Sequence, residues 1–120
     1  MTRAEFDRLC ATLPAVTRVE QWGGASVWKI GGKIFAICSN WGPDTKDGVS
    51  FKCSDFSYTL LCEQDGVVPA PYLARAKWVQ VRDPDALTDD EIANYIETAY
   101  RIVAAKLTRA QRKALGVELT

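Results

Sequence analysis

The sequence contains no histidine and no long hydrophobic run. Without histidine, general acid-base catalysis at neutral pH would need a glutamate, lysine or cysteine with a strongly shifted pKa. No window approaches the roughly 18 apolar residues of a membrane span, and the segment from Met1 to Phe6 lacks the apolar stretch of a signal peptide. We therefore expect a cytoplasmic protein that is not an enzyme and has no membrane partner.

An excess of charge of one sign is also missing, because 15 Lys and Arg residues balance 15 Asp and Glu residues. No overall field would draw the protein to nucleic acid, so any such binding needs a local patch. The apolar share of 48% and the charged share of 25% are typical of a globular protein. The 120 residues are enough for one core, so a single domain over residues 1–120 is expected.

Cysteine motifs are absent as well. Cys10, Cys38, Cys53 and Cys62 stand at spacings that fit neither a CxxC redox pair nor a zinc knuckle. Buried, reduced thiols are the simplest interpretation, and no cofactor is expected. Cys38 and Cys53 could lie on adjacent strands, where a regulatory disulfide would join them, although no motif supports it.

The strongest structural signal is the hairpin over residues 28–38, where two apolar runs meet at Gly31-Gly32. A two-residue turn pairs Trp28 with Phe35 and Ile30 with Lys33. The side chains facing the core would then be Trp28, Ile30, Phe35 and Ile37.

Capping boxes, alternation and turn residues predict the other elements. The predicted order is a helix from Thr2 that Pro14 ends, strands over 17–22, 25–30, 33–38 and 49–53, a helix over 55–64, an extended link over 69–71, a strand over 77–82, a long helix after Thr88 and a short helix from Thr108 to Leu115. The fold class is α+β, with an N-terminal helix, an antiparallel sheet of about five strands, an inserted short helix and a long C-terminal helix in two layers.

Extending the hairpin register through Gly23-Gly24 places Val19 beside Trp28 on the core face and Arg18 opposite Lys29. The opposite face would carry Arg18, Glu20, Trp22, Val27 and Lys29. Two like charges destabilise a strand pair slightly, and Glu20 is the simplest counter-charge.

One face of the predicted sheet mixes aromatic and basic side chains, namely Trp22, Lys29, Lys52, Trp78 and Arg82. Such a surface suits nucleic acid, because aromatic rings stack on bases and cations hold phosphates. The alternative is that the tryptophans pack beneath a helix while the lysine stems reach solvent. We favour packing, given the aromatic area that a core of this size needs.

Near the C-terminus lies the one cluster of basic residues, and its members are Arg101, Lys106, Arg109, Arg112 and Lys113. On DNA a few such contacts give salt-dependent affinity, and we keep Arg109, Arg112 and Lys113 as candidate contacts. Cations near helix C-termini also complement the helix dipole, as do Asp89, Asp90 and Glu91 at the start of the long helix. We favour this explanation for most of the pattern.

Two other candidate sites are rejected. The loop over residues 40–48 lacks the spacing of a phosphate-binding loop, so we exclude a nucleotide site there. The acid pairs Asp89-Asp90 and Asp83 with Asp85 could bind a divalent cation, but helix capping and turn formation account for both.

The order of several short motifs resembles the MmcQ/YjbR family of small bacterial proteins. The motifs are Pro14, Glu20, Trp22-Gly23, Trp28, Gly32-Lys33-Ile34-Phe35, Phe51-Lys52, Pro71-Tyr72-Leu73-Ala74-Arg75, Trp78-Val79, Tyr100 and Lys106-Leu107. The resemblance implies a compact α+β domain with a CyaY-like antiparallel sheet and a double-wing DNA-binding role. It implies no catalytic residues.

We therefore expect a non-catalytic module that binds DNA in a salt-dependent way, as a monomer or weak homodimer. The alternative is a protein-interaction or small-ligand-binding module without a nucleic-acid role, which the zero net charge favours.

Overall fold

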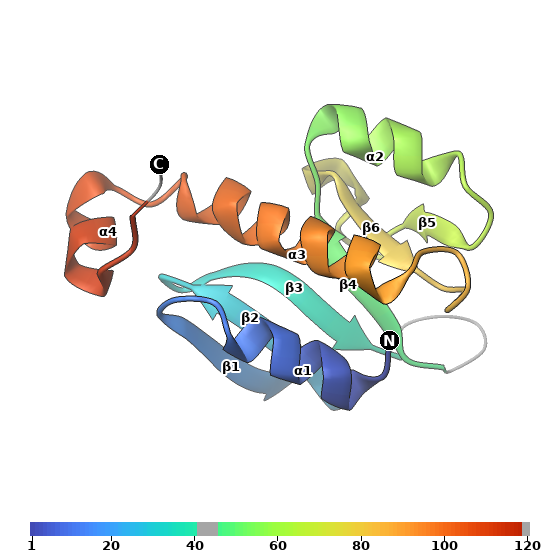
Figure 1. Ribbon diagram of the computed structural model, residues 1–120, viewed down its shortest axis with the longest axis horizontal. Helices are drawn as coiled ribbons and strands as arrows, with labels where there is room; N and C mark the ends of the chain where they lie inside the picture. The colour runs from blue at the N-terminus through green and yellow to red at the C-terminus, as the bar shows by residue number, and fades with distance from the viewer. Residues whose placement is uncertain (41–45, 119–120) are drawn as a thin grey trace.

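The computed structural model describes residues 1–40 and 46–118, and it has the predicted α+β architecture (Figure 1). Its elements in chain order are α1 (Arg3–Ala11), β1 (Val16–Gln21), β2 (Ala25–Ile30), β3 (Lys33–Ser39), β4 (Gly48–Lys52), α2 (Asp55–Cys62), β5 (Val67–Pro69), the 3-10 helix η1 (Ala74–Ala76), β6 (Trp78–Val81), α3 (Asp89–Ala104) and α4 (Arg109–Leu115). α1, α3 and α4 begin at the predicted caps Thr2, Thr88 and Thr108, and Ser54 caps α2.

The described strands form one antiparallel sheet in the order β1-β2-β3-β4-β6-β5. It has six strands rather than about five, because the sequence analysis predicts no strand at β5, which meets the predicted extended link over 69–71 only at Pro69. The strand is three residues long and pairs with β6 as the sheet edge. Proline is tolerated at such an edge, so Pro69 ends the strand without breaking the sheet.

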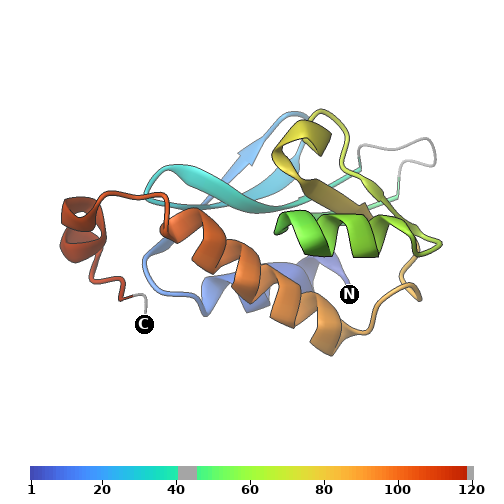
Figure 2. The ribbon, with the colours of Figure 1, turned by 90° about the horizontal axis from the view of Figure 1, so that it is seen from above.

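Three helices cover what we call the first face of the sheet, the side that carries Trp28, Phe35 and Phe51 (Figure 2). α3 crosses β3 and β4, where the Phe35 and Tyr100 rings meet edge to face at 5.5 Å and the Phe51 and Tyr95 rings stack at 5.6 Å. The fully buried side chains of this core include Phe6, Phe35, Phe51, Ile92 and Ile96. The main core therefore lies between the sheet and the helices.

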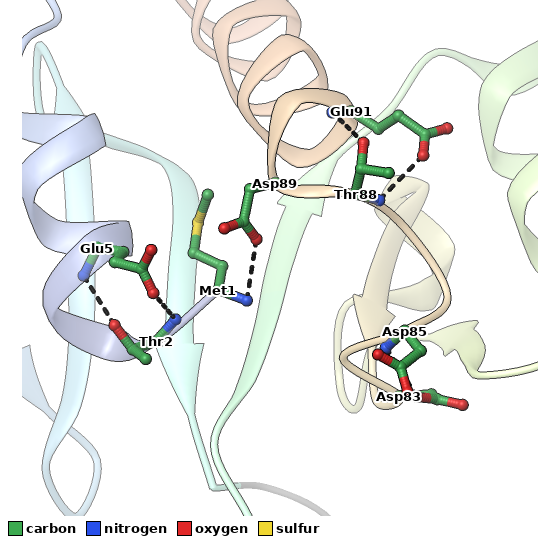
Figure 3. A network of polar contacts seen from close by, with 8 residues as sticks. All are labelled: Met1, Thr2, Glu5, Asp83, Asp85, Thr88, Asp89 and Glu91. Atoms are coloured by element: carbon green, nitrogen blue, oxygen red, sulfur yellow. Dashed lines mark hydrogen bonds and ion pairs between the residues drawn. The ribbon is translucent and has the colours of Figure 1, made fainter.

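Capping boxes hold the starts of α1 and α3, which lie near each other (Figure 3). Thr2 and Glu5 exchange hydrogen bonds at the start of α1, and Thr88 and Glu91 do so at the start of α3. The Met1 amino group lies 3.1 Å from Asp89 Oδ1 and joins the two helix ends. Both boxes confirm the boundaries predicted from the sequence.

The predicted hairpin register of β2 and β3 is correct only next to the turn. Ile30 pairs with Lys33, but Trp28 pairs with Ala36 because a β-bulge at Phe35 shifts the register. The residues from Phe35 to Cys38 are all apolar and buried. Their sequence therefore does not show which side chains point to which face of the sheet, and the bulge cannot be predicted from it. As a result Trp28, Ile30 and Phe35 share the first face as predicted, whereas Ile37 faces the other side of the sheet.

The predicted register of β1 is wrong by one residue. Val19 pairs with Val27, Arg18 with Trp28 and Thr17 with Lys29, because Trp22 joins the two glycines in a three-residue turn with positive φ throughout. A shift of one residue exchanges the two faces of a strand. Arg18 thus lies on the first face, where its Nε donates to Ser26 Oγ at 2.8 Å and lies 3.7 Å from Asp7.

This shift also corrects the partner expected for Arg18. The predicted contact with Lys29 is absent, and the acid beside Arg18 is Asp7 rather than Glu20. Glu20 moves to the first face together with Arg18, while Val27 and Lys29 remain on the opposite side, as predicted.

The cysteines are free, and three of the four are buried. Cys62 is only half-buried, which corrects the expectation that all four lie in the core. Cys38 pairs with Val49 across β3 and β4, so Cys53 lies four positions further along, at roughly 13 Å. This separation exceeds the reach of about 7 Å between the Cα atoms of a disulfide, so a bond between Cys38 and Cys53 is excluded in this fold.

Candidate functional site

The opposite side of the sheet, here called the second face, has no α-helix over it in the described part of the chain. A smaller apolar cluster lies there instead, formed by Ala25, Val27, Ile37, Ala70 and Trp78. The segment from Ala70 to Trp78, which contains η1, crosses this cluster and packs Leu73 against it. This loop covers only part of the apolar surface.

The uncovered part is a cavity of about 390 Å³ that we call the aromatic groove. Its described lining residues are Trp22, Ile34, Ile37, Tyr72, Leu73 and Trp78. β3 and β6 supply the floor, the β1-β2 turn supplies Trp22, and the loop before η1 supplies Tyr72. The lining is almost entirely apolar, and a cleft of this size and character is typical of a small-molecule site.

Two large aromatic side chains stand at the mouth of the aromatic groove. Trp22 is 54% exposed and Tyr72 is 94% exposed, whereas Trp78 on the floor is 5% exposed. Trp22 and Tyr72 have φ values of 51° and 68°, in the left-handed region that bulky residues rarely adopt. Such a conformation costs on the order of 1 kcal/mol or more, so the fold holds both rings at the surface at the expense of stability.

The basic residues that the sequence analysis predicts on one sheet face, beside the tryptophans, lie on the second face. Lys29 is directly opposite Ile34, and Lys52 is directly opposite Trp78, so each lysine neighbours a lining residue. Partial burial lowers the pKa of Lys52, and repulsion from Lys106 and Lys77 lowers it further against the attraction of Asp55. Lys52 Nζ also donates to the Ala76 carbonyl.

Arg82 lies at the other end of the same face. Its Nη1 is 3.4 Å from Gln80 Oε1 and 3.5 Å from the Lys46 carbonyl. The structure thus brings Trp22, Lys29, Lys52, Trp78 and Arg82 together on one face, as the sequence predicts. Trp78 packs beneath Leu73, and this agrees with the packing interpretation for that residue alone.

Buried polar side chains border the apolar floor. Ser50 lies opposite Ile37 and Gln80 lies opposite Ser50, so these residues continue the same row across the second face. Ser39 Oγ, Ser50 Oγ and Gln80 Nε2 are buried and find no hydrogen-bond acceptor or donor within residues 1–40 and 46–118. Sequence analysis missed them, because each looks like an ordinary polar residue of an alternating strand.

The basic cluster near the C-terminus spans the end of α3, the link after it and α4, and its Lys106 adds to the effect of burial in lowering the pKa of Lys52. α4, which carries Arg109, Arg112 and Lys113, stands at the far end of the molecule from α2 (Figure 1). Arg112 Nη1 donates to the Leu107 carbonyl at 2.7 Å, and Arg101 pairs with Glu97 at 2.7 Å. These contacts, together with the position of Arg101, Arg112 and Lys113 in last helical turns, agree with the helix-dipole explanation.

The thiols offer no activated nucleophile. Burial raises the pKa of Cys38 to about 11 and that of Cys53 to about 12. Burial also raises the pKa of Cys10 and Cys62. A catalytic cysteine needs a lowered pKa, and none of the four thiols has one.

The acidic residues considered as a cation site serve other purposes. Asp83 Oδ1 accepts a hydrogen bond from the Asp85 backbone N–H at 2.8 Å, which is a turn interaction (Figure 3). Asp89, Asp90 and Glu91 occupy the first turn of α3. Within the described ranges no three His, Cys, Asp or Glu side chains are grouped to hold a metal ion. Most of the loop over residues 40–48, where we reject a nucleotide site, lies outside the described residues.

In the described part of the chain, no helix has the length and apolar character needed to cross a bilayer.

Tyr72 and Leu73 are the groove residues that sequence analysis missed as site residues. Neither belongs to a periodic element, and only the two prolines beside Ala70 signal a chain that turns over the sheet. Ile37 was predicted as a core residue and is buried, although no α-helix of the described residues covers it, and Ile34 beside it is only partly buried.

Comparison with solved structures supports the fold. A crystal structure of a Deinococcus radiodurans protein with the DUF419 domain superposes with a TM-score of 0.81 at 20% identity, covering 98% of this chain and 89% of that chain. The crystal structure of a Pseudomonas syringae protein gives a TM-score of 0.71 at 18% identity, over 86% of this chain and 99% of the other. No curated protein matches the sequence. The YjbR family model matches residues 11–102, and the chain therefore belongs to the YjbR family.

Proposed function

We propose that this protein is a non-catalytic binding protein and that the aromatic groove is its binding site. The observation that carries the proposal is the pair of exposed aromatic residues, Trp22 and Tyr72, held in left-handed conformations at the mouth of an apolar cavity. Costly local conformations persist where a function needs them. The arrangement suits a flat, apolar group that enters between the rings and contacts Trp78 on the floor.

Single-stranded nucleic acid is a second candidate, and a specific observation favours it. The five sheet residues of the sequence hypothesis share the second face, and exposed aromatics with cations nearby are the means by which proteins hold unpaired bases. The DNA-binding role implied by the family resemblance would then use this face. One fact weakens it, because Trp78 is only 5% exposed and cannot stack on a base.

The test uses a neutral probe, 2-naphthol, and follows binding by chemical-shift changes in the protein. A ligand of this size binds through such a groove with a dissociation constant of roughly 1 mM or below. We expect saturable binding that is weakened about tenfold in Trp22→Ala and unchanged in Phe56→Ala, a matched removal of an exposed aromatic that lies on α2 outside the groove. Saturable binding that Trp22→Ala leaves unchanged would refute the proposal.

Nucleic acid is examined in parallel by fluorescence anisotropy with a mixed-sequence single strand and a duplex. Micromolar binding at about 50 mM salt that vanishes at about 200 mM, and is lost in Lys52→Glu, would support the second candidate. No binding at either salt concentration would remove it.

A further inference from the structure

The aromatic groove has a charged end. Across the sheet, Lys29 on β2 pairs with Ile34 on β3, and Lys52 on β4 pairs with Trp78 on β6. Because Ala36 pairs with Phe51, Lys52 lies at the level of the bulged Phe35 and next to Ile34. The order at this end of the second face is therefore cation, apolar, cation, aromatic.

The two lysines flank the lining residue Ile34 from both sides. They lie on strands separated by one other strand, so their Cα atoms are about 10 Å apart. Lysine side chains are long enough to bring both ammonium groups over the side chain between them. An anionic group at the Ile34 end of the groove would therefore meet two cations at once.

A further cation lies near Lys52. Burial and repulsion from Lys106 both lower the pKa of Lys52, against the attraction of Asp55. Lys77 lies over the Tyr58 ring of α2 at 4.9 Å, on the side of the first face, whereas Lys52 contacts the Ala76 carbonyl. Lys29 makes no ion pair with any acid in residues 1–40 and 46–118.

We propose that the ligand of the aromatic groove is a small aromatic acid, whose ring system enters between Trp22, Tyr72 and Trp78 and whose oxyanion is held by Lys29 and Lys52. The proposal rests on the proposed function and adds the charge and polarity of the ligand. Charge complementarity is the reason for this choice of ligand. An apolar lining with cations at one end suits a molecule that is apolar over most of its length and anionic at one end.

The experiment compares three probes that share one ring system and differ in charge: 2-naphthoate, 2-naphthol and 2-naphthylmethylammonium. Each is titrated into the full chain at about 50 mM salt, with protein chemical shifts as the readout. We expect 2-naphthoate to bind about tenfold more tightly than 2-naphthol, and the cation to bind most weakly. Raising the salt concentration to about 200 mM should reduce the difference in affinity between 2-naphthoate and 2-naphthol, because salt screens the charges.

Substitutions assign the preference to the two lysines. Lys29→Gln and Lys52→Gln together should bring the affinity for 2-naphthoate to within about twofold of that for 2-naphthol, leaving 2-naphthol unchanged. Lys113→Gln on α4 is the matched control and should change neither affinity. Circular dichroism checks that each variant is folded.

The outcomes separate the two proposals. If 2-naphthol and 2-naphthoate bind equally, the groove binds apolar groups but the acid proposal is wrong. If neither probe binds, the groove is not a binding site and both proposals fail. If the single-stranded oligonucleotide binds and depends on Lys29 and Lys52 while 2-naphthoate does not bind, the oxyanion is a backbone phosphate, which overturns the small-acid proposal.

Discussion

The two faces of the sheet are built from similar apolar side chains, yet they differ in what lies over them. On the first face, α1, α2 and α3 cover Phe35 and Phe51 completely. On the second face, a short loop covers Trp78 and leaves a cavity beside Ile34 and Ile37. The first face therefore holds the main core of the fold, and the second face leaves apolar surface uncovered beside Ile34 and Ile37.

The comparison predicts that substitutions on the first face act on stability. Phe51→Ala removes a fully buried ring that stacks on Tyr95, and we expect a loss of about 3–5 kcal/mol in the free energy of unfolding. Urea denaturation measures it. A loss below about 1 kcal/mol would show that α3 does not pack on this face as described.

Alkaline pH should lower the free energy of unfolding through two buried cysteines of the first face. Cys38 and Cys53 have pKa values raised by burial to about 11 and about 12, against about 8.5 in an unfolded chain. Below pH 8.5 both states keep their protons, so the stabilisation is complete. Above it the unfolded chain loses protons first, and the free energy of unfolding falls by up to about 1.4 kcal/mol per pH unit for each thiol.

Urea titrations at several pH values from 8 to 10 check this slope. Cys38→Ala and Cys53→Ala should each make it shallower. A slope unchanged by both substitutions would mean that these thiols are not the titrating groups.

Substitutions on the second face should act on binding instead. Trp22→Ala is expected to lower the affinity for 2-naphthol by about tenfold, because one stacking partner is lost. The same change should alter the free energy of unfolding by less than about 0.5 kcal/mol, since the ring is half exposed. Ligand titration and urea denaturation of the same variant separate the effect on affinity from the effect on stability. A large loss of stability would contradict the proposed difference between the two faces.

The smallest expected effect is the loss of stability when the N-terminal cap of a helix is removed. Thr88→Ala removes the capping box of α3 and should cost about 1 kcal/mol in global unfolding. Thr108→Ala removes the same kind of box from α4, which buries none of its own residues, and should cost less. Equal losses in denaturation experiments would indicate that α4 contributes to the core as much as α3.

Most of the fold could be predicted from local patterns. The caps at Thr2, Thr88 and Thr108 define the helix starts, and the glycine pair at residues 31–32 defines the central hairpin. The register beyond that turn could not be predicted. Where both faces are apolar, as from Phe35 to Cys38, alternation carries no information and a bulge is invisible.

The candidate site could be predicted only in part. The aromatic and basic residues of the strands were identified, because alternation places Lys29, Lys52 and Trp78 on one face once the sheet is assumed. Tyr72 was missed because it lies in a loop whose path over the sheet depends on long-range packing. The turn at Trp22 was misjudged because a tryptophan rarely adopts positive φ.

The most direct test of the contrast between the faces uses the tryptophan indole N–H signals during a titration with 2-naphthoate. Trp22 and Trp78 line the aromatic groove, whereas Trp28 lies on the first face and its Nε1 donates to Asp7 at 2.8 Å. Tryptophan-to-phenylalanine variants assign the signals. We predict that the Trp22 and Trp78 signals shift with saturation while the Trp28 signal stays in place. Saturable shifts confined to Trp28, or no shift in any of the three, would contradict the assignment of the second face as the binding face.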